Sequence, residues 1–181
     1  MRGRYRERRA TRVATLVRNL STARAILAGM DAFPVTVRCP IQWGDMDALG
    51  HVNNARYLTW FESARIALLS QAGILADRPR EIGPILATTT CDFLRPVTDP
   101  GDVVVGAGAT KVGRTSIAME YAVWRADEPE MMCARGSAVV VLVNYGSMAK
   151  VQVPPSVRAA LEQRMRTSAT TSTAEVGTRG R

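Results

Sequence analysis

Hydrophobic and polar residues alternate from Val35 to Trp43, which predicts a β-strand with one apolar face. The odd positions are apolar, and the even positions are polar or proline. Pro40 has no amide hydrogen to donate to a neighbouring strand, so we expect this strand at a sheet edge or beside a bulge. Gly44 follows and allows the chain to bend.

From Asn54 onward the spacing of hydrophobic residues changes to that of a helix. Apolar side chains recur at intervals of three and four, at Tyr57, Phe61, Ala64 and Leu68. Asn53 or Asn54 is a suitable N-cap, and Gly73 is a suitable C-terminal stop. Because further apolar residues widen this stripe, the pattern predicts a long helix that is largely buried.

The rest of the chain predicts mainly strands, at about residues 85–95, 102–111, 114–125 and 131–145. Turns are expected at residues 112–113 and 127–130, and a short helix is expected at 156–165. The last strand is very apolar, so we expect it in the interior of a sheet. One long helix with antiparallel strands predicts an α+β domain whose sheet buries its apolar face on that helix.

The net charge of +8 comes from the two ends of the chain. Residues 1–29 contain eight arginines and one acidic residue, whereas residues 30–166 contain 14 basic and 14 acidic residues. We therefore expect a basic N-terminal extension over 1–29, either disordered or not part of the native product because Met30 is a second candidate start. The domain is expected over 30–166, with a disordered tail over 167–181. A neutral domain argues against a nucleic-acid partner.

Neither a membrane span nor a disulfide framework is expected. No stretch approaches the roughly 18 consecutive apolar residues of a transmembrane helix, although residues 13–27 could form a basic amphipathic helix that contacts a membrane surface. Cys39, Cys91 and Cys133 are far apart and form no C-x-x-C pair. This usage is typical of reduced cysteines in a cytoplasmic protein, and buried packing is their simplest role.

Several catalytic classes are excluded by missing motifs. The chain has no G-x-S-x-G nucleophile elbow, and His51 is its single histidine, so a multi-histidine metal site is absent. Residues 108–115 come close to a phosphate-binding loop, but Arg114 stands where lysine is required and the segment lies between two strands. A hairpin turn is the better interpretation, and we expect no metal or organic cofactor.

Asp45 and Asp47 are the residues most suggestive of chemistry. In an extended chain they would share one face, unless Gly44 breaks the register. One could fix the loop through backbone amides, and the other could act catalytically beside the helix N-terminus, where amides favour negative charge. Simple turn chemistry is the alternative for both. His51 is either a hydrogen-bonded structural residue or part of a polar pocket.

The segment WGDMDALGHVNNARYLTWFESAR, residues 43–65, resembles the signature of hotdog-fold acyl-CoA thioesterases of the 4-hydroxybenzoyl-CoA thioesterase type. The portion DMDALGHVNNARYLTWFE is most similar to bacterial members that act on fatty acyl-CoA. The resemblance extends over about residues 33–165. It implies a curled, five-stranded antiparallel sheet wrapped around one long central helix, assembled as a homodimer or homotetramer with active sites at the subunit interface.

The resemblance also implies roles for individual residues. Asp47 matches the catalytic acid, and the backbone N–H of Asn54 matches the oxyanion donor. Lys111 and Arg114 are candidates for contact with the phosphates of CoA. The stretch from Gly50 to Asn54 departs from the members that act on aromatic acyl groups, which favours a fatty acyl substrate.

We therefore expect hydrolysis of an acyl-CoA thioester to a free acid and CoA, with Asp47 as general base or as nucleophile. The remaining substrate-binding candidates are Asp45 as loop organiser, His51 and Asn53 on the polar side, and Tyr57 and Phe61 along the acyl chain. The alternative is a hotdog module that binds acyl-CoA without catalysis. A hotdog dehydratase or hydratase is a second alternative, but its motif is not found.

Overall fold

The computed structural model describes residues 29–75 and 81–165, and the expectations for the two chain ends lie almost wholly outside these ranges. The described chain contains β1 (Val35–Pro40), a 3₁₀ turn η1 (Trp43–Asp45), α2 (Asn54–Gln71), β2 (Ile82–Phe93), β3 (Asp102–Val112), β4 (Ser116–Arg125), β5 (Met132–Asn144) and α3 (Pro155–Glu162). The expected α+β order, with the long helix between the first strand and the others, is confirmed.

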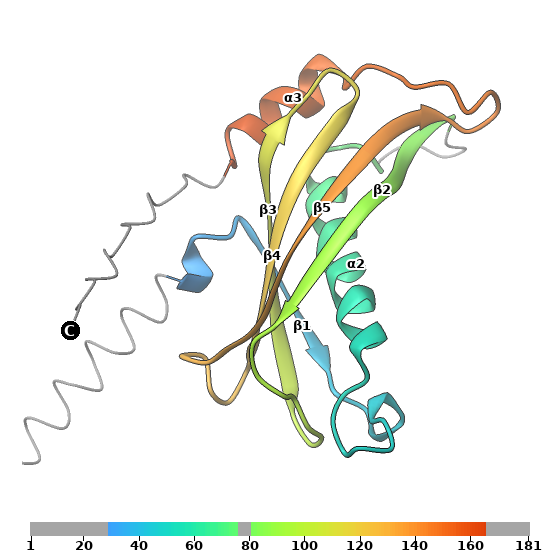
Figure 1. Ribbon diagram of the computed structural model, residues 1–181. Coiled ribbons are helices and arrows are strands. Elements are labelled where there is room, and N and C mark those ends of the chain that lie inside the picture. Colours follow the sequence, from blue (N-terminus) through green and yellow to red (C-terminus); the bar gives the residue numbers. More distant parts are fainter. Residues whose placement is uncertain (1–28, 76–80, 166–181) are drawn as a thin grey trace, which may run out of the picture.

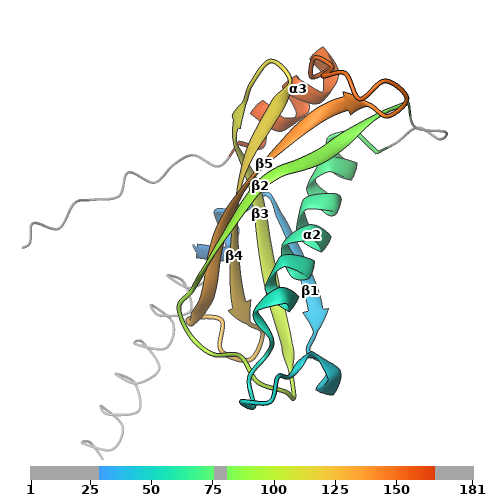
Figure 2. The same cartoon turned by 45° about the vertical axis from the view of Figure 1, so that its right-hand side comes forward.

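The strands of the described residues form one antiparallel sheet with the order β1-β3-β4-β5-β2. The sheet curls, and α2 lies along its concave face (Figures 1 and 2). Alternate residues of β3, among them Val103, Val105 and Ala107, are buried on the side that faces the core. As expected, β5 is an interior strand, and β1, which ends in Pro40, lies at an edge.

Local sequence signals set both ends of α2. The side chain of Asn53 accepts a hydrogen bond from the Ala55 amide at 2.9 Å and caps the N-terminus. At the other end Gly73 adopts a φ of +87°, and the Ile74 amide donates to the Leu69 carbonyl at 3.0 Å. A left-handed glycine after the last turn is the usual way to satisfy late carbonyls, so both predicted boundaries are confirmed.

The predicted first strand extends too far at its C-terminal end. The strand stops at Pro40, and Trp43 is 84% exposed instead of facing the core. The cause is the η1 turn, in which the Asp45 amide donates to the Gln42 carbonyl at 2.8 Å. The expectation that the apolar face continues to Trp43 is therefore wrong, because a local turn overrides the alternating pattern.

The short helix α3 closes one end of the core. The Arg158 guanidinium donates to the carbonyls of Val112 and Gly113, at 2.9 and 2.7 Å, and so ties α3 to the β3–β4 hairpin. Arg164 donates to the side chain of Gln71 at the C-terminal end of α2. Figure 1 shows α3 and this hairpin at the end of the molecule opposite to the N-terminus of α2. None of the helices within 29–75 and 81–165 is long and apolar enough to cross a membrane.

Gly136 on β5 tests the packing of α2 on the sheet. A Cβ at this position would lie 2.5 Å from Cε2 of Phe61 and would also meet the carbonyl of Thr90, so alanine cannot be accommodated without movement. We expect Gly136→Ala to lower the free energy of unfolding by about 1–3 kcal/mol, the usual cost of overpacking. Urea unfolding followed by circular dichroism measures the change.

Gly44→Ala is the matched control, because a Cβ at Gly44 meets nothing within 4 Å. Its free energy of unfolding should stay within about 1 kcal/mol of the wild-type value. Equal stability of the two variants would contradict the close packing of Phe61 against β5.

Candidate active site

The loop between β1 and α2 is organised by Asp45. This side chain is buried; its Oδ2 accepts a hydrogen bond from the Gln42 amide at 3.0 Å, and its Oδ1 lies 2.8 Å from Nε of Arg56 in an ion pair. Its carbonyl accepts from the amide of Asn53 at 2.8 Å. Asp45 therefore joins the η1 turn to the first turn of α2, and its carboxylate is engaged within the loop.

Asp47 has a different environment although it is two residues away. It is half-buried, and its Oδ1 accepts hydrogen bonds from the amides of Leu49 at 2.8 Å and His51 at 3.3 Å. Its own amide donates to the His51 carbonyl at 2.7 Å, which closes the small loop. Within the described part of the chain, Oδ2 has no hydrogen-bond partner. Oδ1 thus holds the carboxylate in place, while Oδ2 is left without a partner in the described chain.

The N-terminus of α2 supplies the neighbouring polar groups. Asn54 is the first residue of the helix, and no acceptor for its amide is found among the described residues. Amides of a first helical turn lack partners within the helix, and the helix dipole adds partial positive charge there. The amide of Asn54 is therefore available to a carbonyl oxygen or an oxyanion.

Asp47 and Asn54 line the same pocket, which has a volume of about 460 Å³. The pocket is formed by Asp47, His51, Val52, Asn54, Tyr57, Phe93, Leu94, Arg95 and Pro96. Its size lies in the usual range for small-molecule sites, and its lining combines apolar walls with a few polar groups. In such a pocket an unpaired amide can polarise a carbonyl group, and a carboxylate can attack it or activate water.

The residues at the end of β2 and just after it were not foreseen as site residues. Phe93 packs edge-on against Tyr57 with their ring centroids 5.1 Å apart, and Leu94, Arg95 and Pro96 continue the pocket wall. In the sequence they appear only as the end of a strand. The pairing of β2 with β5 brings these residues beside α2, and no local sequence pattern predicts that contact.

Tyr57 is a neutral group in this pocket. Burial is the main factor that raises the pKa of its phenol to about 12, and the neighbouring Cys133 and Cys91 add to the shift. At neutral pH the hydroxyl is therefore protonated. It contributes shape and a hydroxyl that can donate a hydrogen bond, but no charge.

The other predicted site residues lie outside the pocket of this single chain. The side chain of Asn53 caps α2, and Phe61 is fully buried and stacks on Tyr121 with centroids 4.6 Å apart. Lys111 and Arg114 are exposed at the β3–β4 hairpin beside α3, at the opposite end of α2. Of the predicted site residues, the structure brings together Asp47, His51, Asn54 and Tyr57 in one pocket.

The described residues offer no alternative centre based on metal or thiolate chemistry. No group of three or more His, Cys, Asp or Glu residues within them could hold a metal ion. Cys39, Cys91 and Cys133 are free thiols, and burial raises the pKa of each. A raised pKa keeps these thiols protonated and weakly nucleophilic at neutral pH.

Solved structures with the same fold come from several bacteria. The chain is 33% identical to the PA2801 protein of Pseudomonas aeruginosa, with a TM-score of 0.66 and coverage of 71% of this chain and 98% of that one. It is 31% identical to a thioesterase of Thermus thermophilus solved with coenzyme A and Zn, with a TM-score of 0.64 and coverage of 74% and 96%. The PA5185 protein of P. aeruginosa is 26% identical, with a TM-score of 0.68 and coverage of 76% and 96%.

These neighbours confirm that the curled sheet around α2 is a hotdog fold. The sequence pattern of the thioesterase-like superfamily matches residues 41–161, which include the Asp47 loop, α2 and all strands from β2 to β5. The match therefore covers the pocket and the elements that position it. Since it also spans well over half of the chain, the protein belongs to the thioesterase-like superfamily.

Proposed function

We propose that the protein hydrolyses acyl-CoA thioesters to a free acid and CoA. The observation that carries this proposal is the shared pocket of Asp47 and Asn54 at the N-terminus of α2. Thioester hydrolysis needs a group that activates or replaces water and a donor for the oxygen that becomes negatively charged. The carboxylate of Asp47 and the amide of Asn54 match these two requirements, and membership of the superfamily supports the reaction class.

The oxyanion would form at the helix N-terminus. A thioester carbonyl that accepts a hydrogen bond from the Asn54 amide becomes more electrophilic, and the same amide stabilises the tetrahedral oxyanion. Loss of one such donor typically slows a reaction by about 10²–10³-fold. Because Asn54 contributes through its backbone, substitution of its side chain leaves this donor in place.

Asp47 can act in either of two ways. As general base it takes a proton from water, the hydroxide adds to the carbonyl carbon, and collapse of the intermediate expels the CoA thiolate, which takes up the proton. As nucleophile its carboxylate adds directly and expels the thiolate, and water then hydrolyses the mixed anhydride. The open Oδ2 is compatible with both routes.

We propose the CoA portion of the substrate from the similarity of this chain to a thioesterase of known structure. The related thioesterase of T. thermophilus was solved with coenzyme A. Lys111 and Arg114 remain our candidates for the CoA phosphates. They belong to the β3–β4 hairpin, which lies beside α3 at the end of α2 opposite to Asn54 (Figure 1). If they contact a substrate bound at Asn54, they must therefore do so from a second copy of the chain.

We propose a fatty acyl group as the other half of the substrate. Val52, Tyr57, Phe93, Leu94 and Pro96 give the pocket its apolar walls. This lining favours an alkyl chain, and the resemblance of the Gly50–Asn54 segment to fatty acyl-CoA enzymes points the same way. We place the reaction in the cytoplasm, which accords with three free thiols.

A homo-oligomer is proposed from the exposed edge of the sheet. β2 is hydrogen-bonded to β5 on one side, and its other edge is unpaired within the described chain. Leu86 and Phe93 on this strand and Leu58 on α2 are large apolar side chains that remain exposed. An unpaired edge with apolar neighbours is a ready site for strand pairing, so we propose that a second copy pairs with β2.

Asp47→Asn tests the proposed chemistry. Asparagine keeps an Oδ1 acceptor for the Leu49 and His51 amides but cannot accept a proton or form an anhydride, so the fold should persist. We expect kcat on a good acyl-CoA to fall by about 10²–10⁴-fold. The measurement is free thiol release from a panel of acyl-CoAs. Turnover by Asp47→Asn at the wild-type rate would remove Asp47 from the mechanism. If the wild type itself binds acyl-CoA tightly but releases no thiol, the non-catalytic module is favoured.

Asp45→Asn tests whether Asp45 has a structural role, in contrast to the catalytic role proposed for Asp47. The change removes the charge that pairs with Arg56 while it keeps an acceptor for the Gln42 amide. We expect the free energy of unfolding to fall by about 1–3 kcal/mol, with a much smaller loss of kcat than in Asp47→Asn. Unfolding in urea and steady-state kinetics on the same preparation measure both quantities. A kcat loss as large as that of Asp47→Asn would give Asp45 a direct chemical role.

Leu86→Lys tests the proposed interface at β2. A charged side chain at a paired edge opposes strand association, so we expect the mass from analytical ultracentrifugation to shift toward that of one chain. Leu49→Lys is the control, because Leu49 is also an exposed leucine but lies on the Asp47 loop. An unchanged mass for Leu86→Lys, with an oligomeric wild type, would place the interface elsewhere.

A further inference from the structure

The loop at residues 94–101 supports the Asp47 segment from one side. The Val52 amide donates to the Val97 carbonyl at 2.9 Å, and the Ile41 amide donates to the Gly101 carbonyl at 2.9 Å. Between these points the Asp99 amide contacts Sδ of Met46 at 3.4 Å. The backbone on both sides of Asp47 therefore rests on a loop that also contributes three residues of the pocket wall.

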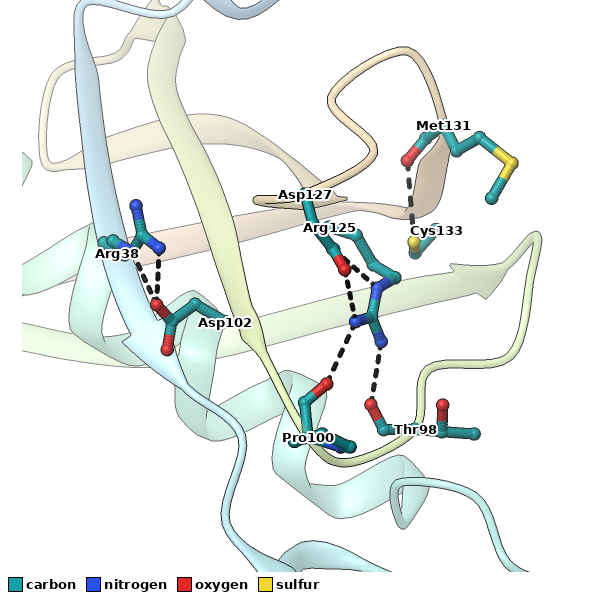
Figure 3. Close-up of polar contacts among 8 residues, drawn as sticks. All are labelled: Arg38, Thr98, Pro100, Asp102, Arg125, Asp127, Met131 and Cys133. Atoms are coloured by element: carbon teal, nitrogen blue, oxygen red, sulfur yellow. Dashed lines mark hydrogen bonds and ion pairs between the residues drawn. The ribbon is translucent and has the colours of Figure 1, made fainter.

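Arg125, at the end of β4, holds this loop from its other side. Figure 3 shows its guanidinium between the loop and the start of the β4–β5 connection. Nη1 donates to the Thr98 carbonyl at 2.8 Å, and Nη2 donates to the Pro100 carbonyl at 3.0 Å. The side chain is only 13% exposed, so these hydrogen bonds are shielded from competing water.

Asp127 fixes the orientation of the guanidinium. Its carboxylate accepts from Nε at 2.8 Å and from Nη2 at 2.9 Å, and the hydrogen bond from Arg125 lowers the pKa of Asp127. The backbone approaches Arg125 closely at Gly101, where a Cβ would lie 2.7 Å from Nη2 and φ is +141°. A glycine at this position allows the loop to reach the guanidinium.

We propose that Arg125 is a positioning residue for the active site. By holding the carbonyls of Thr98 and Pro100, it keeps the loop at 94–101 in the place where the loop supports the Asp47 segment and forms the pocket wall. The inference rests on the proposed function, because it assigns the effect of Arg125 to the geometry of Asp47. Displacement of a reacting group by about 1 Å can cost about 10²-fold in rate.

The fork geometry of arginine is what this role requires. Arginine offers five N–H donors in one plane, and here they serve two carbonyls and a carboxylate at the same time. Methionine keeps much of the length and apolar contact of the side chain but has no donor. Lysine keeps the charge, yet its single ammonium group cannot serve all three partners in this geometry.

The first measurement compares Arg125→Met with Arg135→Met. Arg135 also pairs with an aspartate, Asp92, at 3.0 Å, but both side chains are mostly exposed and neither lines the pocket. At a temperature at which both variants are folded, we expect Arg125→Met to lower kcat/KM by about 10- to 100-fold, mostly through kcat. Arg135→Met should stay within about twofold of the wild type.

A double-mutant cycle with Asp47→Asn distinguishes positioning from general loss of structure. If Arg125 acts through the placement of Asp47, Arg125→Met should cost less than about threefold on the residual rate of the Asp47→Asn chain. Equal losses in the two backgrounds would overturn the proposal. Should Arg125→Met fail to fold, Arg125→Lys enters the same cycle with the same expectations.

Amide hydrogen exchange tests the support of the loop without reference to activity. In Arg125→Met the amides of Ile41 and Val52 should exchange about tenfold faster or more than in the wild type, and they should be unchanged in Arg135→Met. Unchanged protection in Arg125→Met would overturn the proposal even if the wild type is an active thioesterase. A wild type that releases no thiol would instead remove the proposed function, and the exchange rates would still decide whether Arg125 holds the loop.

Discussion

The packing of α2 into the concave face of one curled sheet is the constraint on which the rest of the structure depends. A single sheet has no second sheet against which to bury its apolar face, so the long helix must fill that role. Phe61 illustrates how closely the two fit, because its ring stacks on Tyr121 and approaches β5 at a glycine. This packing fixes the middle of α2 against the sheet, so the surroundings of its two ends determine where ligands can reach the helix.

The two ends of α2 have different surroundings. At the C-terminal end, α3 and the β3–β4 hairpin close the core, joined by the hydrogen bonds of Arg158. At the N-terminal end, the amide of Asn54 has no acceptor among the described residues, and Asn54 lines a pocket together with Asp47. The fold thus places an amide-rich helix terminus near a carboxylate, and we propose this end of α2 as the place for chemistry on an acyl carbonyl.

The two carboxylates of Asp45 and Asp47, separated by one residue, have different surroundings. Asp45 is buried and satisfied by Arg56 and the Gln42 amide, as a buried charge requires. Asp47 lines the pocket, and its Oδ2 has no hydrogen-bond partner within the described residues. The loop at 94–101, held by Arg125, completes the pocket wall and supports the backbone around this residue. Backbone amides donate most of the hydrogen bonds that hold the Asp47 segment in place.

The amino-acid sequence by itself determined the features that depend on neighbours in the chain. The period of hydrophobic residues after Asn54, the capping asparagine and Gly73 specify α2, and the loop chemistry between Asp45 and Asn54 places an acid beside its first turn. The tertiary structure alone decided that Phe93 to Pro96 line one pocket with Tyr57, that Asp45 pairs with Arg56, and that Arg125 reaches the carbonyls of Thr98 and Pro100. Those contacts join segments that are separated in the chain, and no local sequence pattern predicts them. They arise only when the strands pair and the sheet curls around the helix.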